Sequence, residues 1–194
     1  IEHGGAAPVI VAEDATIADA LPKLVKGGFY HAGQVCVSVQ RVYAHESIAR
    51  QLADDIAHHA KALVVGDPLQ KATEVGPLIS SKEVERVSQW VNEAKAAGAQ
   101  ILAGGKTLSL TCYAPTVIYN PSADAKVSLS EVFGPVICIY PYSDLDQAIG
   151  CANQLPFAFQ ASIFTKDIEK ATYAYRQLDA SAVMVNDHTA VRVD

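Results

Sequence analysis

The sequence lacks the patterns that mark several large classes of protein. No apolar run approaches the roughly 20 residues that span a bilayer, and the first residues have neither the charged nor the apolar region of a signal peptide. The 15 lysines and arginines are outnumbered by 21 acidic residues and form no basic stripe that could neutralise phosphates. We therefore expect a cytoplasmic protein that has neither a membrane nor a nucleic acid as partner.

Motifs that bind nucleotide phosphates or metals are also absent. No GxGxxG segment opens a helix after a strand, and there is no GxxxxGK[ST] loop. The six histidines show no ligand spacing, and the adjacent pair His58 and His59 would point about 100° apart on a helix. The sequence therefore predicts no metal site, and we interpret the histidines as solvated or interfacial.

The four cysteines stand far apart, without a CxxC pair. Because disulfides are concentrated in small secreted domains, we expect reduced thiols. Cys138 lies in a strand-like run and Cys151 in a helix-like segment, and we interpret both as packing residues. We give Cys112 the same interpretation, although it stands in a polar stretch. Cys36 differs, because it follows a glycine in a turn between a helix-like and a strand-like segment. This position favours a catalytic nucleophile.

Strand-like and helix-like segments alternate along the 194 residues, half of which are hydrophobic. Thr16 with Asp19, and Ser80 with Glu83, have the spacing of capping boxes, and Pro22 allows a kink in the first helix. The predicted class is an α/β, three-layer domain with a largely parallel sheet covered by helices. Strands are expected at 8–12, 37–44, 100–103, 114–119, 136–140, 161–164 and 182–185, and helices at 16–28, 46–63, 80–97, 144–152 and 167–178.

Three segments together resemble motifs of the aldehyde dehydrogenase superfamily. EHGGAAP at 2–8 resembles its E-x-G-G-x-x-P segment, GQVC at 33–36 its nucleophile segment, and EVFGP at 131–135 its cofactor-ribose segment. Their order, and the separation of Glu2 from Cys36, also match the family. FTKD at 164–167 and Val185-Asn186 are similar to further family landmarks, so the resemblance spans essentially the entire chain.

The resemblance implies roles for individual residues. Cys36 is expected to attack a small aldehyde, because a thiohemiacetal can give up hydride to NAD or NADP and leave a thioester. Glu2 would be the general base for the water that hydrolyses this thioester to a free acid. The resemblance also implies that Glu131 contacts the nicotinamide ribose, that Phe133 packs near the nicotinamide ring, and that Gly5 belongs to the cofactor-binding set.

The same resemblance predicts that residues 1–194 are a catalytic domain without its N-terminal cofactor-binding domain and C-terminal oligomerisation segment. Both chain ends have the character of cuts in a longer polypeptide, whose full length is expected to form a homo-oligomer. We therefore expect the isolated chain to be inactive as a dehydrogenase. The VCVSVQR version of the nucleophile segment resembles members that act on small hydroxylated or anionic aldehydes such as lactaldehyde.

Two alternatives from other functional classes stay open at this point. Cys36 could serve a thiol esterase or hydrolase together with a histidine such as His31, because thioester hydrolysis is already half of the proposed mechanism. Alternatively, the fold could be a non-catalytic interaction module. In that case Cys36 would react with iodoacetamide no faster than Cys112.

Overall fold

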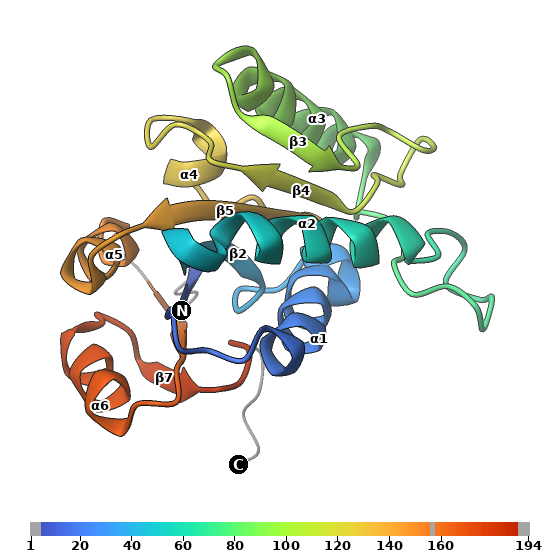
Figure 1. The fold of residues 1–194 in the computed structure, drawn as a ribbon. Coiled ribbons are helices and arrows are strands. Elements are labelled where there is room, and N and C mark those ends of the chain that lie inside the picture. Colours follow the sequence, from blue (N-terminus) through green and yellow to red (C-terminus); the bar gives the residue numbers. More distant parts are fainter. Residues whose placement is uncertain (1–4, 156–157, 190–194) are drawn as a thin grey trace.

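One mixed sheet organises the chain, seen in a computed structural model that describes residues 5–155 and 158–189 (Figure 1). Its strands are ordered β3-β4-β5-β2-β1-β6-β7. Only the β3–β4 pair is antiparallel within the described residues, so the predicted α/β class with a largely parallel sheet is confirmed. The strands are β1 (Ala7–Val11), β2 (Val39–His45), β3 (Gln100–Ala103), β4 (Thr116–Tyr119), β5 (Val136–Tyr142), β6 (Gln160–Phe164) and β7 (Ala182–Val185).

Helices cover both faces of this sheet. They are α1 (Ile17–Phe29), α2 (Glu46–Ala62), α3 (Ser81–Ala96), α4 (Lys126–Leu129), α5 (Leu145–Ala152) and α6 (Ile168–Gln177). Successive residues of β5 show the two layers: Ile137 packs against Gly28 of α1, whereas the thiol of Cys138 lies 4.0 Å from the carbonyl oxygen of Val127 in α4. The helices α1 and α2 therefore lie on one face, and α3 to α6 lie on the other (Figure 1).

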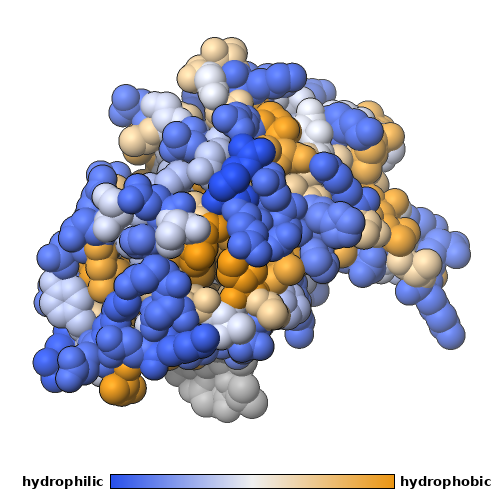
Figure 2. Space-filling view, viewed as in Figure 1, coloured by the Kyte–Doolittle hydropathy of each residue, from blue (hydrophilic) through white to orange (hydrophobic). Residues whose placement is uncertain are grey.

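The central strands are buried on both sides, which explains why they read as continuous apolar runs. All five residues of β1 and all five of β6 are buried. A parallel sheet covered on both faces leaves no solvent-facing position, so strict alternation of polar and apolar residues is not needed. On the face in Figure 2, polar residues cover most of the surface and apolar residues form separate patches. None of the described helices has the length and apolar character needed to cross a membrane.

The helix ends differ from the capping prediction. Thr16 and Ser80 do stand at the N-caps of α1 and α3, but neither side chain makes a capping hydrogen bond. Side-chain caps occur instead at Asp144 of α5 and Asp167 of α6, whose carboxylates accept backbone N–H groups. The predicted N-cap positions are therefore confirmed, whereas the capping hydrogen bonds expected there are not formed. The helix α1 continues through Pro22 without a break.

The topology brings the described part of the first family-like segment, residues 5–8, and the two other family-like segments to one edge of the sheet. They lie at the start of β1 and directly before β2 and β5, and these three strands are parallel neighbours in the order β5-β2-β1. The amino ends of parallel neighbours lie at the same edge, with the Cys36 segment in the middle. The fold therefore places segments that are about 100 residues apart in sequence beside one another.

Candidate active site

Cys36 lies in a tight turn between α1 and β2. A short 3-10 segment, Tyr30–Gly33, follows α1, and its last three residues have positive φ values of 50°, 55° and 70°. Such left-handed backbone is uncommon for residues other than glycine. The backbone N–H of Ser38 then donates to the carbonyl of Val35 at 3.0 Å, which closes the turn that presents Cys36. The Cys36 side chain is half-buried, so it is held in place yet reachable.

Two hydroxyl groups attach the far end of this turn to the rest of the domain. The buried Ser38 hydroxyl lies 3.3 Å from the carbonyl oxygen of Gly27 and 3.4 Å from that of Gly28, both in α1. The buried Thr189 hydroxyl donates to the carbonyl of Val37 at 2.7 Å. The nucleophile turn is therefore fixed by the preceding helix and by a segment beyond β7.

The turn touches the EVFGP segment directly at Gly33. A Cβ atom added to Gly33 would lie 2.1 Å from the carbonyl oxygen of Gly134, so only glycine permits this approach. Phe133 also has a positive φ, of 48°, which is unusual for a bulky side chain. Strained backbone of this kind concentrates at functional sites. The structure thus brings the Cys36 turn and the Glu131–Pro135 segment together.

A hollow of about 750 Å³ opens between these two segments. Phe133 lines it from one side, with 40% of its surface exposed, and Val35 and His31 line it from the nucleophile turn. The opposite wall includes Pro77 and Ile79 from the loop before α3. The hollow has room for a ring-shaped group against Phe133, next to the turn that carries Cys36.

Gln34 locks this loop to the nucleophile turn. Its side-chain N–H group donates to the carbonyl of Pro77 at 3.1 Å, and its amide oxygen accepts the backbone N–H of Ile79 at 2.9 Å. One planar amide thereby supplies both a donor and an acceptor to the same loop. The glutamine that precedes Cys36 by two positions therefore shapes the wall of the hollow.

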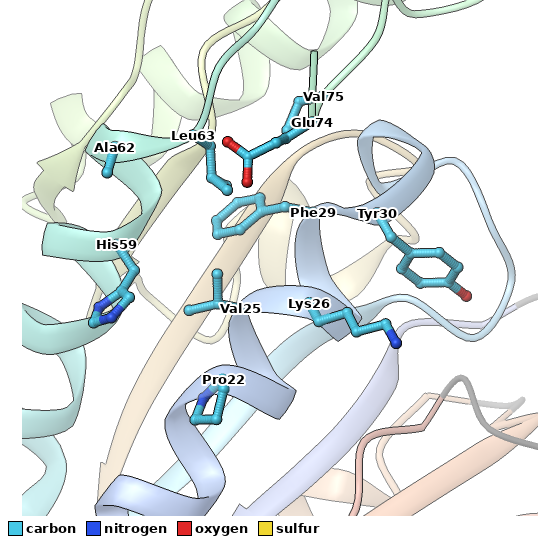
Figure 3. Close-up of a pocket in the computed structure, with 10 residues that line it drawn as sticks. All are labelled: Pro22, Val25, Lys26, Phe29, Tyr30, His59, Ala62, Leu63, Glu74 and Val75. Atoms are coloured by element: carbon cyan, nitrogen blue, oxygen red, sulfur yellow. The ribbon is translucent and has the colours of Figure 1, made fainter. Parts of the chain in front are cut away.

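A second cavity, of about 430 Å³, is lined by Tyr30 and shares Glu74 with the hollow (Figure 3). Phe29 and Val25 of α1 form its apolar floor, and the carboxylate of Glu74 points toward them from above (Figure 3). Lys26 and Tyr30 extend together on one side of it (Figure 3). Burial raises the pKa of Tyr30, and the negative charge of a Cys36 thiolate nearby would raise it further. Tyr30 therefore connects this cavity electrostatically to the Cys36 turn.

The structure tests the grouping of the predicted site residues. Cys36, Glu131 and Phe133 lie on the two segments that meet at Gly33, and Gly5 is half-buried just before β1. Glu2 lies outside the described residues, so its role as general base stays a prediction. Among the described residues, no hydrogen bond joins His31 to Cys36. The exposed ring of His31 instead packs on Tyr30 at 5.0 Å between centroids.

The packing role predicted for the other three cysteines is confirmed for two of them. Cys138 is buried, and burial raises the pKa of its thiol to about 12, which makes it unreactive. Cys151 is half-buried and packs against the buried apolar cluster that includes Ile149 and Ala152, so its packing role is confirmed too. Cys112 is half-buried in a polar loop, so its interpretation as a core residue was wrong.

Sequence reasoning assigned no role to Gln40 and Arg41, which follow Cys36 in β2. Arg41 is buried and donates to the carbonyl of Ala6 at 3.0 and 2.9 Å, and to those of Cys151 and Ala152 at 3.2 and 3.1 Å. It therefore holds the residue after Gly5 against the C-terminal end of α5, where a cation is favourable. The available signal was a pair of polar residues inside an otherwise valine-rich strand.

The entire chain, residues 1–194, matches the aldehyde dehydrogenase family. The chain belongs to this family. A 3-sulfolactaldehyde dehydrogenase from Priestia aryabhattai is 39% identical over 194 residues, which are all of this chain and 40% of that protein. The resemblance drawn from the three motifs is thus confirmed.

Solved aldehyde dehydrogenase structures confirm the fold. Glyceraldehyde-3-phosphate dehydrogenase GapN from Methanocaldococcus jannaschii, complexed with NADP, superposes with a TM-score of 0.93 at 36% identity, over 98% of this chain and 41% of that one. A betaine aldehyde dehydrogenase from Staphylococcus aureus, in complex with NAD+, gives 0.91 at 31% identity, over 97% and 40%. The chain therefore spans about 40% of the length of these relatives.

Proposed function

We propose that this chain is the catalytic domain of an NAD(P)-dependent aldehyde dehydrogenase that oxidises an aldehyde to a carboxylic acid. The observation that carries the proposal is the contact at Gly33, which brings the Cys36 turn against the segment of Glu131 and Phe133 beside an open hollow. Hydride transfer requires a nucleophile beside a cofactor-binding surface, and the contact between these two segments supports assigning them these roles. The matching family and its solved complexes with NAD or NADP support the same activity.

In this proposal Cys36 forms the covalent bond to the substrate. Its thiolate would attack the carbonyl carbon, and its own backbone N–H would stabilise the oxyanion that forms. The hollow beside Val35 and Phe133 fits a nicotinamide ring in size and in the exposed aromatic surface it offers. NAD or NADP held there would supply the acceptor for the hydride. Glu131 would hydrogen-bond the ribose, and Gly5 would belong to the same binding surface.

Release of the acid needs a water molecule and a base. Glu2 is proposed as the general base that takes a proton from this water, which then attacks the thioester carbonyl and returns the Cys36 thiolate. Water supplies the second oxygen of the carboxylic acid product.

The proposed substrate is a small hydroxylated or anionic aldehyde. The 39% identical relative is named for 3-sulfolactaldehyde, which is both, and Lys26 supplies a cation at the cavity that adjoins Tyr30. Opposite charge at a binding cavity favours an anionic ligand. A substrate panel of lactaldehyde, 3-sulfolactaldehyde and the cationic betaine aldehyde tests this, and preference for betaine aldehyde would contradict it.

The isolated 194-residue chain is proposed to be inactive as a dehydrogenase. It spans about 40% of its relatives, and the family resemblance places one oxyanion-hole donor and the cofactor-binding domain in the remainder. Loss of one such donor alone costs about 100- to 1,000-fold in rate. The full-length enzyme is further proposed to be a cytoplasmic homo-oligomer.

The test uses the full-length enzyme that contains this chain. Cys36→Ser should abolish NAD(P)H formation, whereas Cys112→Ser, a control at another half-buried thiol, should leave it unchanged. Glu2→Gln should give a burst of NAD(P)H without sustained turnover, because the thioester forms but is not released. Full activity of Cys36→Ser would refute the proposal, and iodoacetamide labelling of Cys36 no faster than of Cys112 would favour an interaction module.

A further inference from the structure

The start of β2 contains a register shift beside the Cys36 turn. Ala7 of β1 pairs with Val39, but the next residue, Pro8, pairs with Arg41, so Gln40 is an extra residue in β2. An extra residue in a strand redirects its side chain and is frequent next to active sites. Gln40 is the fourth residue after Cys36 in the same short stretch of chain.

The redirected side chain reaches the segment that carries Glu131. The side-chain N–H group of Gln40 donates to the carbonyl of Val127 at 3.0 Å and to that of Ser130 at 2.8 Å. Its amide oxygen accepts the backbone N–H of Val132 at 2.8 Å. The side chain is buried, with 4% of the residue exposed, so these bonds are shielded from water.

The bonds fix the residues on both sides of Glu131. Ser130 and Val132 are each held by Gln40, and the carbonyl of Val132 also accepts the Arg86 guanidinium at 2.6 Å. The backbone of Glu131 is thus tied to the strand that follows Cys36. The Ser130 carbonyl needs a donor and the Val132 N–H needs an acceptor, and a side-chain amide provides both.

We propose that Gln40 is a positioning residue that sets the Glu131 carboxylate for the cofactor and couples its place to that of Cys36. The inference rests on the proposed function, in which Glu131 binds the ribose. Gln40 touches neither substrate nor cofactor; it acts through the backbone of Ser130 and Val132. Its loss should weaken cofactor binding while leaving the nucleophile turn, which is closed by its own bonds, intact.

The experiment uses the full-length enzyme with Gln40→Met, which keeps the length of the side chain and removes all three bonds. Gln160→Met is the matched control, because Gln160 is equally buried, at 3% exposed, and its amide oxygen accepts no hydrogen bond from any described residue. The measurements are the Kd and KM for NAD and NADP, the KM for the aldehyde, and the rate of Cys36 alkylation by iodoacetamide without cofactor.

Gln40→Met should raise the cofactor Kd and KM about tenfold, and should change the aldehyde KM and the alkylation rate by less than about twofold. Gln160→Met should change none of them by more than about twofold. In a double variant with Glu131→Gln, the effect of Gln40→Met should largely disappear, because Gln40 acts through Glu131. Removal of a merely structural bond would instead add its effect to that of Glu131→Gln.

Three results would overturn the proposal: an unchanged cofactor Kd in Gln40→Met, an equal loss of Cys36 reactivity, or additive effects in the double variant. If Gln40→Met does not fold, Gln40→Glu takes its place. The glutamate carboxylate still accepts the N–H of Val132, but it donates no hydrogen bond to Val127 or Ser130. An unchanged cofactor Kd in Gln40→Glu would equally overturn the proposal. A wild-type enzyme that forms no NAD(P)H from any aldehyde would overturn the proposed function, and this inference with it.

Discussion

Replacement of Gly33 by alanine tests the contact on which the candidate site depends. Gly33 has φ +70°, and an added Cβ would meet the carbonyl oxygen of Gly134 at 2.1 Å and its carbonyl carbon at 2.6 Å. Gly98 is the control, because its φ of +99° is also positive but an added Cβ meets nothing within 4 Å. The difference between the two variants therefore isolates the cost of separating the two segments.

The magnitudes can be worked out from these contacts. Alanine in left-handed backbone costs roughly 1–2 kcal/mol, which both variants share. Forcing extra volume into a packed contact costs roughly 1–3 kcal/mol more, and only Gly33→Ala incurs it. We therefore expect Gly33→Ala to lower the free energy of unfolding by about 2–5 kcal/mol and Gly98→Ala by about 1–2 kcal/mol.

Urea denaturation of the 194-residue chain, followed by circular dichroism, measures both values. In the full-length enzyme, Gly33→Ala should also slow NAD(P)H formation, because the Cys36 turn and the Phe133 segment can no longer meet, while Gly98→Ala should not. The reasoning is refuted if Gly33→Ala loses no more stability than Gly98→Ala.

Two further predictions concern charged side chains. Arg41→Met should lower the free energy of unfolding by about 3–5 kcal/mol, because buried carbonyls lose their donors. The exposed control Arg50→Met should change it far less, and equal losses in urea denaturation would contradict this prediction. Lys170 binds Glu13 and Asp14 at 2.7 and 3.3 Å. The hydrogen bond from Lys170 is the main cause that lowers the pKa of Glu13. Desolvation alone would raise the pKa of Asp14, but hydrogen bonds from the Thr165 side chain, a backbone N–H and Lys170 lower it overall. Lys170→Met should therefore lower the free energy of unfolding by about 1 kcal/mol or less. This loss should be full at pH values above the ordinary pKa values of 4.5 and 3.8, and should disappear as the pH falls through the lowered pKa values of the folded protein. If urea denaturation shows the same loss at pH 7 and at pH 3, the prediction is refuted.

Local sequence patterns were sufficient for most of the helices and strands. The apolar stripe of α2 and the short apolar runs of β1 and β6 follow from side-chain burial at periods that the sequence displays. Helix capping was less predictable, because Thr16 and Ser80 have the right side chains but do not turn them onto the backbone. A cap depends on one side-chain rotamer, and spacing alone does not determine it.

The sequence by itself determined the α/β class, the family and the candidate site residues Cys36, Glu131 and Phe133. The class rests on local periodicity, and the family and the site residues rest on short motifs whose residues are near one another in the chain. Only the tertiary structure decided that Gly33 touches Gly134 and that the extra residue Gln40 holds the segment around Glu131. The Gln40–Val132 bond joins positions 92 residues apart. Such a contact depends on strand order and register, which no local periodicity contains.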